Sequence, residues 1–332
     1  MRRFIATIVG VGIFMGLIVA PVIFSSSDFA DGQPGPVVNF EIAQGESGSA
    51  IAQHLVSAGV IQSASTFISE YNAKTSARGI SPGLHRIETH ISTKRSIFEL
   101  LDPVRIQGLI KVQEGATYAS VLKSLRASGQ IDFSSPLPKS LAPTIANASH
   151  SWEGQLAPAH YSFPSHTTLT QAITQMSAAF TQETAQLHLA NGVTGYTDYQ
   201  NLTVASLVQI EGDPKDYSKV ARVIFNRLKI GMALQLNSTV QYALGTQGRI
   251  TLSRKATQVI SPYNTYLHTG LPPTPIAFPS VSAIAATLAP ASGDWLYFIT
   301  VKPGDTRFTA TYSEFEQWVA LFNTNVAKGL FK

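Results

Sequence analysis

The segment 203-TVASLVQIEG-212 places a carboxylate at the end of an apolar helical stripe. Val204, Leu207 and Val208 recur at helical spacing, and Glu211 falls on the same face of the helix. Burial of a carboxylate is costly unless it is paired or protonated, and desolvation raises its pKa. Because a Glu that keeps its proton near neutral pH can donate it, Glu211 is the candidate general acid of a catalytic site.

Glu211 also has two structural interpretations. Its side chain could reach solvent where the helix ends at Gly212, or it could form a buried ion pair with Arg222 or Arg227. Few other acids in the C-terminal half compete for a catalytic role. The other acids there lie in loop-like or surface contexts: Asp213, Asp216, Asp294, Asp305, Glu314 and Glu316.

The residues that follow Glu211 are rich in amide, hydroxyl and aromatic side chains. Amides can pair with the hydroxyl groups of a sugar, and aromatic rings can stack on its apolar face. The candidate substrate-binding residues of this kind are Gln235, Tyr242, Tyr263, Asn264 and Thr265. Their chemistry indicates a sugar polymer as substrate.

A second carboxylate stands out in the segment 153-EGQLAPAHY-161. Glu153 could accept backbone N–H bonds in a turn, or it could bind substrate opposite Glu211 in a glycan cleft. Two carboxylates across a cleft suit glycoside hydrolysis, and their separation determines its stereochemistry. The sequence leaves both interpretations open.

Composition narrows the class of protein. Only 13% of the 332 residues are charged, and the net charge of +4 comes with no nucleic-acid motif, so we expect no nucleic-acid partner. The chain has no cysteine, and its eight histidines form no metal-binding pair. No phosphate-binding loop or G-x-S-x-G elbow is present, and the sequence predicts neither a metal nor a cofactor.

One further match, the S-x-x-K motif of acyl-enzymes at Ser120 and Lys123, is discounted. The same positions hold Ala50 and Gln53 in the first copy of an internal repeat, so they belong to a structural helix.

That repeat relates 45-GESGSAIAQHLVSAGVI-61 to 115-GATYASVLKSLRASGQI-131 without gaps. Each copy follows a strand-like segment, 38–43 or 109–113, and each predicts a glycine turn, an amphipathic helix and a glycine C-cap. The repeat therefore predicts two small βα units.

Residues 4–24 form an uncharged apolar run that is long enough to span a bilayer as a helix. Arg2 and Arg3 precede it, which predicts a cytoplasmic N-terminus and an extracytoplasmic remainder. A cleaved signal peptide is the alternative. We divide the chain into a tip, membrane helix and linker at 1–36, a repeat region at 37–135 and a catalytic domain at 136–332.

Further elements are expected in the last part of the chain. A helix should cover about 169–189, and Asp213 and Pro214 should start another that ends at Gly231. Residues 295–301 and 307–312 predict a hairpin, and 313–326 predict a final helix. The fold class that we expect is α+β.

The segment 205–279 resembles the MltG/YceG-like endolytic murein transglycosylases. The matching pieces are ASLVQIEG, VARVIFNRLKIGMALQLNSTVQYALG, LSR and SPYNTYLHTGLPPTPIAFP. The segment WEGQLAPAHYSF resembles a further motif of that family, with His160 where the family usually has Thr. The likeness covers nearly everything after residue 37, including a LysM-like repeat region.

This resemblance implies a single-pass enzyme of the cell membrane that cleaves nascent peptidoglycan, with a lysozyme-like catalytic domain. It implies that one Glu protonates the bond between N-acetylmuramic acid and N-acetylglucosamine and then activates the muramyl 6-hydroxyl. The product would be a 1,6-anhydromuramyl end that terminates strand elongation. A penicillin-binding peptidoglycan synthase would be its partner, and membrane lipid would surround the N-terminal helix.

The chain departs from the family at one important position. Many members carry E-x-E here, whereas this chain has Gln209 and Glu211. Since Gln cannot exchange a proton, an active enzyme must use Glu211. A hydrolytic muramidase and a non-catalytic peptidoglycan-binding scaffold are the alternative functions.

Overall fold

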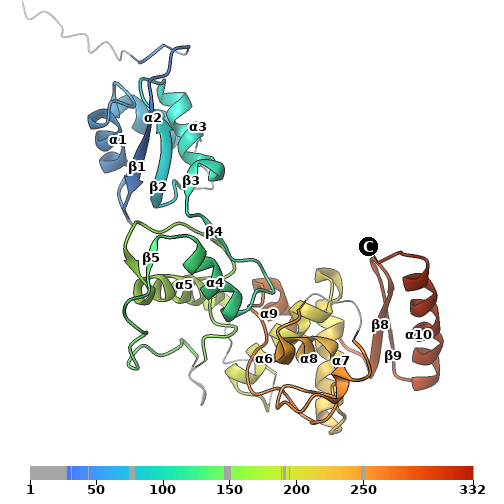
Figure 1. The fold of residues 1–332 in the computed structure, drawn as a ribbon. Coiled ribbons are helices and arrows are strands. Elements are labelled where there is room, and N and C mark those ends of the chain that lie inside the picture. The colour runs from blue at the N-terminus through green and yellow to red at the C-terminus, as the bar shows by residue number, and fades with distance from the viewer. Residues whose placement is uncertain are drawn as a thin grey trace, which may run out of the picture.

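The structure, a computed structural model, describes residues 28–30, 32–43, 45–74, 79–145, 151–187, 189, 192–193, 195–247 and 252–331. It is mixed α+β, as predicted, and four units follow one another along a bent line (Figure 1). The predicted membrane-spanning segment at residues 4–24 lies outside the described residues. In the part of the chain that is described, no helix is both long and apolar enough to cross a bilayer.

The N-terminal unit packs three helices on a small antiparallel sheet of order β1-β2-β3. Its elements are β1 (Val37–Ile42), α1 (Gly48–Ser57), α2 (Ala64–Lys74), β2 (Gly83–Glu88), α3 (Thr93–Leu101), a 3-10 turn (Pro103–Arg105) and β3 (Ile106–Gln107). Its core contains Leu55, Phe67 and Ile87, which are fully buried.

The middle unit joins four short strands to two helices. Its elements are β4 (Ile110–Lys111), α4 (Tyr118–Ala127), β5 (Ile131–Asp132), β6 (His160–Tyr161), β7 (Thr167–Thr168), α5 (Leu169–Thr184) and a 3-10 turn (Ala185–Leu187). β4 pairs with β6 antiparallel and β5 with β7 parallel. Leu125 of α4 shares one core with Trp152, Phe163 and Ile173, so residue 135, the predicted domain boundary, falls inside a packed unit.

The two repeat copies fold as the predicted βα units. The entry glycines Gly45 and Gly115 have φ of 75° and 80°, and the C-terminal glycines Gly59 and Gly129 have φ of 69° and 71°. L-residues rarely adopt this left-handed region, so glycine marks both ends of each unit. Equivalent hydroxyls cap the two helices, because Ser47 accepts from Ala50 N and Thr117 accepts from Ser120 N.

The helical unit contains Glu211, which is the last residue of its first helix. Its elements are α6 (Asp198–Glu211), a 3-10 turn (Pro214–Asp216), α7 (Tyr217–Lys229), α8 (Asn237–Leu244), a 3-10 turn (Ala256–Gln258) and α9 (Val281–Leu288). The apolar stripes of α6 and α7 face each other in one core, with Val204, Leu207, Val220 and Ile224 almost fully buried.

The C-terminal unit is the predicted hairpin and helix: β8 (Tyr297–Lys302), β9 (Asp305–Thr309) and α10 (Tyr312–Ala327). β8 and β9 pair antiparallel around a turn at Gly304, which has a φ of 77°. Asn226 of α7 donates through Nδ2 to the carbonyl of Trp295 at 2.9 Å, which fastens the start of this unit to the helical unit.

The middle and helical units are joined by a backbone pair. Gly115 N donates to Phe278 O and Phe278 N donates to Ala116 O, both at 2.8 Å. Gly154 passes so close to Pro275 that a Cβ at position 154 would lie 2.7 Å from a carbon of the proline ring. Residues 275–278 therefore run between two units rather than along a free surface loop.

The separate cores predict separate effects of equivalent substitutions. Leu55→Ala and Leu125→Ala remove the same repeat position, which is fully buried in each unit. Each should lower the free energy of unfolding by about 2–5 kcal/mol, but in different units. Hydrogen exchange should show lost protection in α1 for the first and in α4 for the second. Leu244→Ala is the matched control, because that side chain is 42% exposed. If either core variant lost protection in both α1 and α4, the two units would not have separate cores.

Candidate functional site

Glu211 is the last residue of α6, and the helix packing fixes where its side chain points. Val204, Leu207 and Val208 are fully buried on the stripe that leads to it. Gly212 ends the helix under Tyr217, and a Cβ at position 212 would lie 3.0 Å from that ring. The chain therefore turns tightly after Glu211, which leaves the carboxyl facing the start of α8.

The N-terminus of α8 lacks a side-chain acceptor of its own. Its N-cap residue is Leu236, which makes no capping hydrogen bond. Ser238 N donates instead to Glu211 Oε1 at 3.4 Å, so the carboxyl approaches the free N–H groups of the first turn. The N-terminal end of a helix favours negative charge, and the Glu211 carboxyl lies next to this end of α8.

Burial raises the pKa of Glu211 above its ordinary value. The hydrogen bonding of Ser238 and the charge of Arg227 act in the opposite direction, because both stabilise the ionised form, but burial is the largest cause. Glu211 therefore keeps its proton to higher pH than an exposed Glu and can donate it.

The carboxyl lies on the wall of a cavity of about 600 Å³ between the helical and C-terminal units. The helical unit contributes Glu211, Arg227, Leu234, Gln235, Leu236, Asn237, Leu252 and Tyr266. The C-terminal unit and the end of the chain contribute Tyr297, Phe298, Ile299, Thr300, Tyr312, Phe315, Phe322 and Phe331. Glu211 is the only carboxylate among these described residues. Amide, hydroxyl and aromatic groups make up much of the remaining wall.

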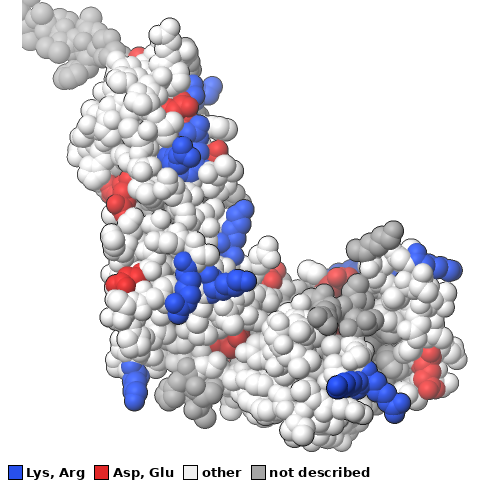
Figure 2. Space-filling view, viewed as in Figure 1, with Lys and Arg blue, Asp and Glu red and all other residues white. Residues whose placement is uncertain are grey.

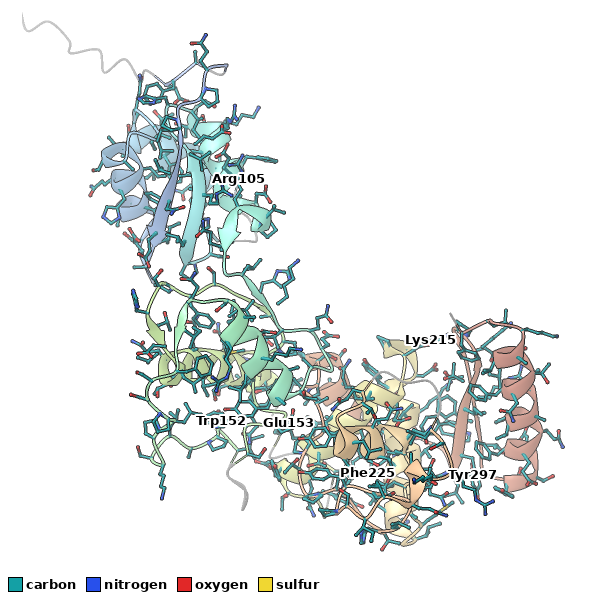
Figure 3. All side chains as sticks on the ribbon, viewed as in Figure 1. Arg105, Trp152, Glu153, Lys215, Phe225 and Tyr297 are labelled. Carbon is teal, nitrogen blue, oxygen red and sulfur yellow. The ribbon has the colours of Figure 1, made fainter. Side chains whose placement is uncertain are left out.

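Neither arginine proposed as an ion-pair partner takes that role. The ion pairs that the described residues form do not include Glu211. Arg227 donates through Nε to Leu296 O and through Nη1 to Leu234 O, both at 2.6 Å, and Arg222 donates through Nη2 to Pro290 O at 3.3 Å. Both guanidinium groups hold backbone carbonyls of neighbouring loops. Arg227 also lies over the ring of Tyr297, which Figure 3 labels beside the helical unit.

Gln235 is the predicted substrate-binding residue that shares the cavity with Glu211. It is exposed, and its φ of 51° places a non-glycine residue in the left-handed region. Such backbone strain concentrates at functional sites. Gln235 N donates to Thr265 O at 3.0 Å, which holds this strained residue in place.

Asn264 and Thr265 do not line the cavity; they build the loop behind it. Both are buried. Asn264 Nδ2 donates to Thr257 O at 3.0 Å and to Val259 O at 2.7 Å, and Thr265 Oγ1 accepts from Leu236 N at 3.0 Å. These side chains hold the loop that backs the cavity wall.

Glu153, Tyr242 and Tyr263 lie at the junction between the middle and helical units, away from the cavity lining. Figure 3 shows Glu153 at this junction. Glu153 accepts from Tyr118 N at the start of α4 and from the hydroxyl of Tyr242 in α8, both at 2.9 Å. The Tyr242 ring packs on Tyr263, with centroids 4.9 Å apart, and the Tyr263 hydroxyl bonds to Thr274 Oγ1 at 2.9 Å. The backbone-accepting interpretation of Glu153 therefore describes its contacts.

Asn237 and Tyr266 also line the cavity. They are linked, because the tyrosine hydroxyl donates to Asn237 Oδ1 at 2.7 Å. Their polar and aromatic character and their place in the LQLN and YNTY segments mark them in the sequence, as they do the residues predicted to bind a sugar polymer. Tyr297 and Thr300 had no such signal, since they reach the cavity only when the hairpin docks on α7.

The described residues contain no group of three or more His, Asp or Glu close enough together to hold a metal ion. Gln209 lies away from the cavity, where its Oε1 accepts from Ser280 N at 2.8 Å at the start of α9.

Glu153 yields a prediction about stability and pH. Burial raises its pKa to about 7, against an ordinary value of 4.5. A raised pKa means that the folded state binds the proton more tightly than the unfolded state does. The stability that this tighter binding contributes is therefore present at low pH and is lost as pH rises from about 4.5 to 7. The loss should be about 3 kcal/mol. Glu153→Gln should remove this part of the pH dependence of unfolding.

The measurement is chemical unfolding of both proteins at pH 4.5 and pH 8. As pH rises, the free energy of unfolding of Glu153→Gln should increase relative to that of the wild type. Glu314→Gln, at an exposed acid of α10, is the control and should leave the profile unchanged. Parallel profiles for wild type and Glu153→Gln would contradict the raised pKa.

Comparison with known proteins places this geometry in context. The chain matches the model of the YceG-like family over residues 40–321. It is 31% identical over 299 residues to the endolytic murein transglycosylase of Bacillus subtilis (strain 168). That alignment covers 83% of this chain and 82% of the Bacillus protein. It is 34% identical over 188 residues to the endolytic murein transglycosylase of Streptococcus pneumoniae (strain D39), which covers 55% of this chain and 34% of that protein.

A solved structure is also similar. The crystal structure of a YceG-like protein from Listeria monocytogenes superposes with a TM-score of 0.54 and 26% sequence identity. The superposition covers 85% of this chain and 99% of that one.

Proposed function

Because this chain belongs to the YceG-like family, we propose that it is an endolytic peptidoglycan transglycosylase in which Glu211 is the acid and the base. One observation carries the role of Glu211: it is the only carboxylate on the wall of the cavity, among the residues described there, and burial raises its pKa. The names of the relatives in Bacillus and Streptococcus support the reaction class.

The reaction can be written with this one group. Protonated Glu211 donates its proton to the glycosidic oxygen between N-acetylmuramic acid and N-acetylglucosamine, and the bond from that oxygen to C1 breaks. The 6-hydroxyl oxygen of the same muramyl residue attacks C1, and its proton passes to the Glu211 carboxylate. The new C1–O6 bond closes the 1,6-anhydro ring, water is not consumed, and Glu211 ends protonated as it began.

The cavity favours this route over hydrolysis. Glycoside hydrolases commonly use two carboxylates, one as acid and the other as nucleophile or base. The described wall offers one carboxylate, and Glu153 is engaged at the junction of the middle and helical units. An internal nucleophile needs no second carboxylate, because the acid that gave its proton can accept the next one.

The proposal also covers where the enzyme works. The apolar run at 4–24 after Arg2 and Arg3 supports a single membrane span with a cytoplasmic N-terminus and an extracytoplasmic cavity. We assign the βα repeats to LysM-like glycan binding, and the catalytic part to a lysozyme-like mode of action. Cleavage near the membrane would terminate strand elongation beside a penicillin-binding synthase.

Glu211→Gln should reduce strand cleavage by roughly 10²–10⁴-fold, since Gln cannot exchange the proton. The measurement is digestion of purified peptidoglycan, followed by mass spectrometry of the muramyl ends. The wild type should produce 1,6-anhydromuramyl ends. Gln209→Ala, which leaves the cavity wall intact, is the matched control and should keep most of the activity.

Each alternative function gives a different product. Reducing muramyl ends that incorporate oxygen-18 from labelled water would establish a muramidase. Binding to sacculi without any cleavage by the wild type would establish a scaffold. Undiminished anhydromuramyl ends from Glu211→Gln would remove Glu211 from the mechanism.

The raised pKa predicts the pH profile. Only protonated Glu211 can start the reaction, so kcat/KM should fall as pH rises through the folded pKa. Since burial raises that pKa, the alkaline limb should lie above the ordinary carboxyl value of 4.5. The profile is measured on soluble glycan strands, with unfolding followed in parallel. An alkaline limb at or below pH 4.5 would contradict the proposal that a desolvated Glu211 is the acid.

A further inference from the structure

Helix α3 and the turn after it expose large apolar side chains. Phe98 is 73% exposed, Leu101 is 38% exposed and Val104 is 89% exposed. An adjoining side of the same helix is buried in the unit's core through Ile97 and Leu100. The exposed residues thus form an apolar face on one side of the N-terminal unit, which we term the α3 face.

The chain enters the described structure at the start of this same helix. Both carboxylate oxygens of Asp28 accept from Thr93 N, at 3.0 and 2.9 Å, and Oδ1 also accepts from the Thr93 hydroxyl at 3.2 Å. Phe29 packs edge-on against the ring of His90, with centroids 5.0 Å apart. Gly35 N donates to Thr89 O at 2.7 Å. These contacts clamp the entering segment onto the unit.

The clamp leaves little chain between the α3 face and the apolar run. The run ends at residue 24, four residues before Asp28, and a fully extended chain covers at most about 14 Å over that length. Phe98 is five residues beyond Thr93, which is about 8 Å along a helix. If residues 4–24 span the bilayer, the α3 face must lie close to the membrane surface.

Lys94 supplies the α3 face with an exposed cation of the kind that binds a lipid phosphate. Lys94 precedes Phe98 by one helical turn, and none of the ion pairs of the described residues includes it. Arg95 and Arg105 are paired with Glu88 and Glu99, and Asp102 is the further acid. Figure 2 shows Lys and Arg side chains gathered along an edge of this unit.

A hollow of about 320 Å³ lined by Ser92, Lys94, Arg95 and Phe98 opens on this face. It sets a cation and a hydroxyl beside an exposed aromatic ring. A phospholipid has the same order, with its phosphate next to the start of its acyl chains.

We propose that the α3 face rests on the outer surface of the membrane, with Phe98, Leu101 and Val104 in the interfacial region and Lys94 at a lipid phosphate. This inference rests on the membrane anchorage proposed above. A lipid surface is the occupant because the short tether brings it to the face in every molecule, whereas a protein partner would have to compete for that place. The contact fixes the orientation of the unit, and through it the direction in which the other units extend from the membrane.

The test uses the full-length chain in lipid nanodiscs. The chain has no cysteine, so Phe98→Cys and Val104→Cys each allow one fluorescent label, and Val56→Cys is the matched control. Val56 is 37% exposed on α1, which Figure 1 draws at the other edge of the unit from α3. Lipids with a nitroxide at the acyl-chain start should quench the labels at 98 and 104 at least twofold more than the label at 56.

Equal quenching at 98, 104 and 56 would overturn the proposal, and so would failure of the chain to enter nanodiscs. Lys94→Glu should reduce quenching at 98 in nanodiscs that contain phosphatidylglycerol, and unchanged quenching would remove Lys94 from the contact. Each labelled protein is also assayed on soluble glycan strands. Cleavage that persists while quenching is absent would disprove the membrane contact and leave the proposed reaction standing.

Discussion

The contact between the Glu211 carboxyl and the first turn of α8 is the interaction around which the site is built. α8 starts at Asn237, and its N-cap residue Leu236 supplies no acceptor, so a group from outside the helix must accept from the free N–H groups of the first turn. Thr265 holds the backbone of Leu236, and its own carbonyl holds Gln235 in a left-handed conformation. The loop behind the cavity thus exists to place the helix start opposite the acid.

Desolvation raises the pKa of Glu153, which is buried, and of Glu211, which is half-buried, but the two carboxyls have different surroundings. Both oxygens of Glu153 are engaged, by Tyr118 N and by the Tyr242 hydroxyl, and its surroundings are packed. Glu211 borders a cavity of about 600 Å³ and accepts a long hydrogen bond, 3.4 Å, from Ser238 N. Desolvation alone therefore does not identify a catalytic acid. Access to a ligand-sized space separates the two.

Local patterns predicted the parts of the site that depend on local periodicity. The helical stripe placed Glu211, and the glycine spacing placed both βα units, because these features follow from backbone geometry within one element. Asn264 and Thr265 were assigned to substrate because loop-building and sugar-binding use the same side-chain groups. Tyr297 reaches the cavity only through docking of the hairpin by Arg227, a contact between distant segments that no local pattern encodes.

The glutamine at 209 has a structural role that needs no charge. Its Oε1 accepts the N–H of Ser280 at the start of α9, and an amide oxygen serves such a donor as a carboxylate oxygen would. Two residues along a helix differ by about 200°, so Gln209 and Glu211 face different neighbours. Gln209 accepts from the backbone N–H of the N-cap residue of α9, and Glu211 borders the cavity. A neutral residue at 209 therefore preserves the framework.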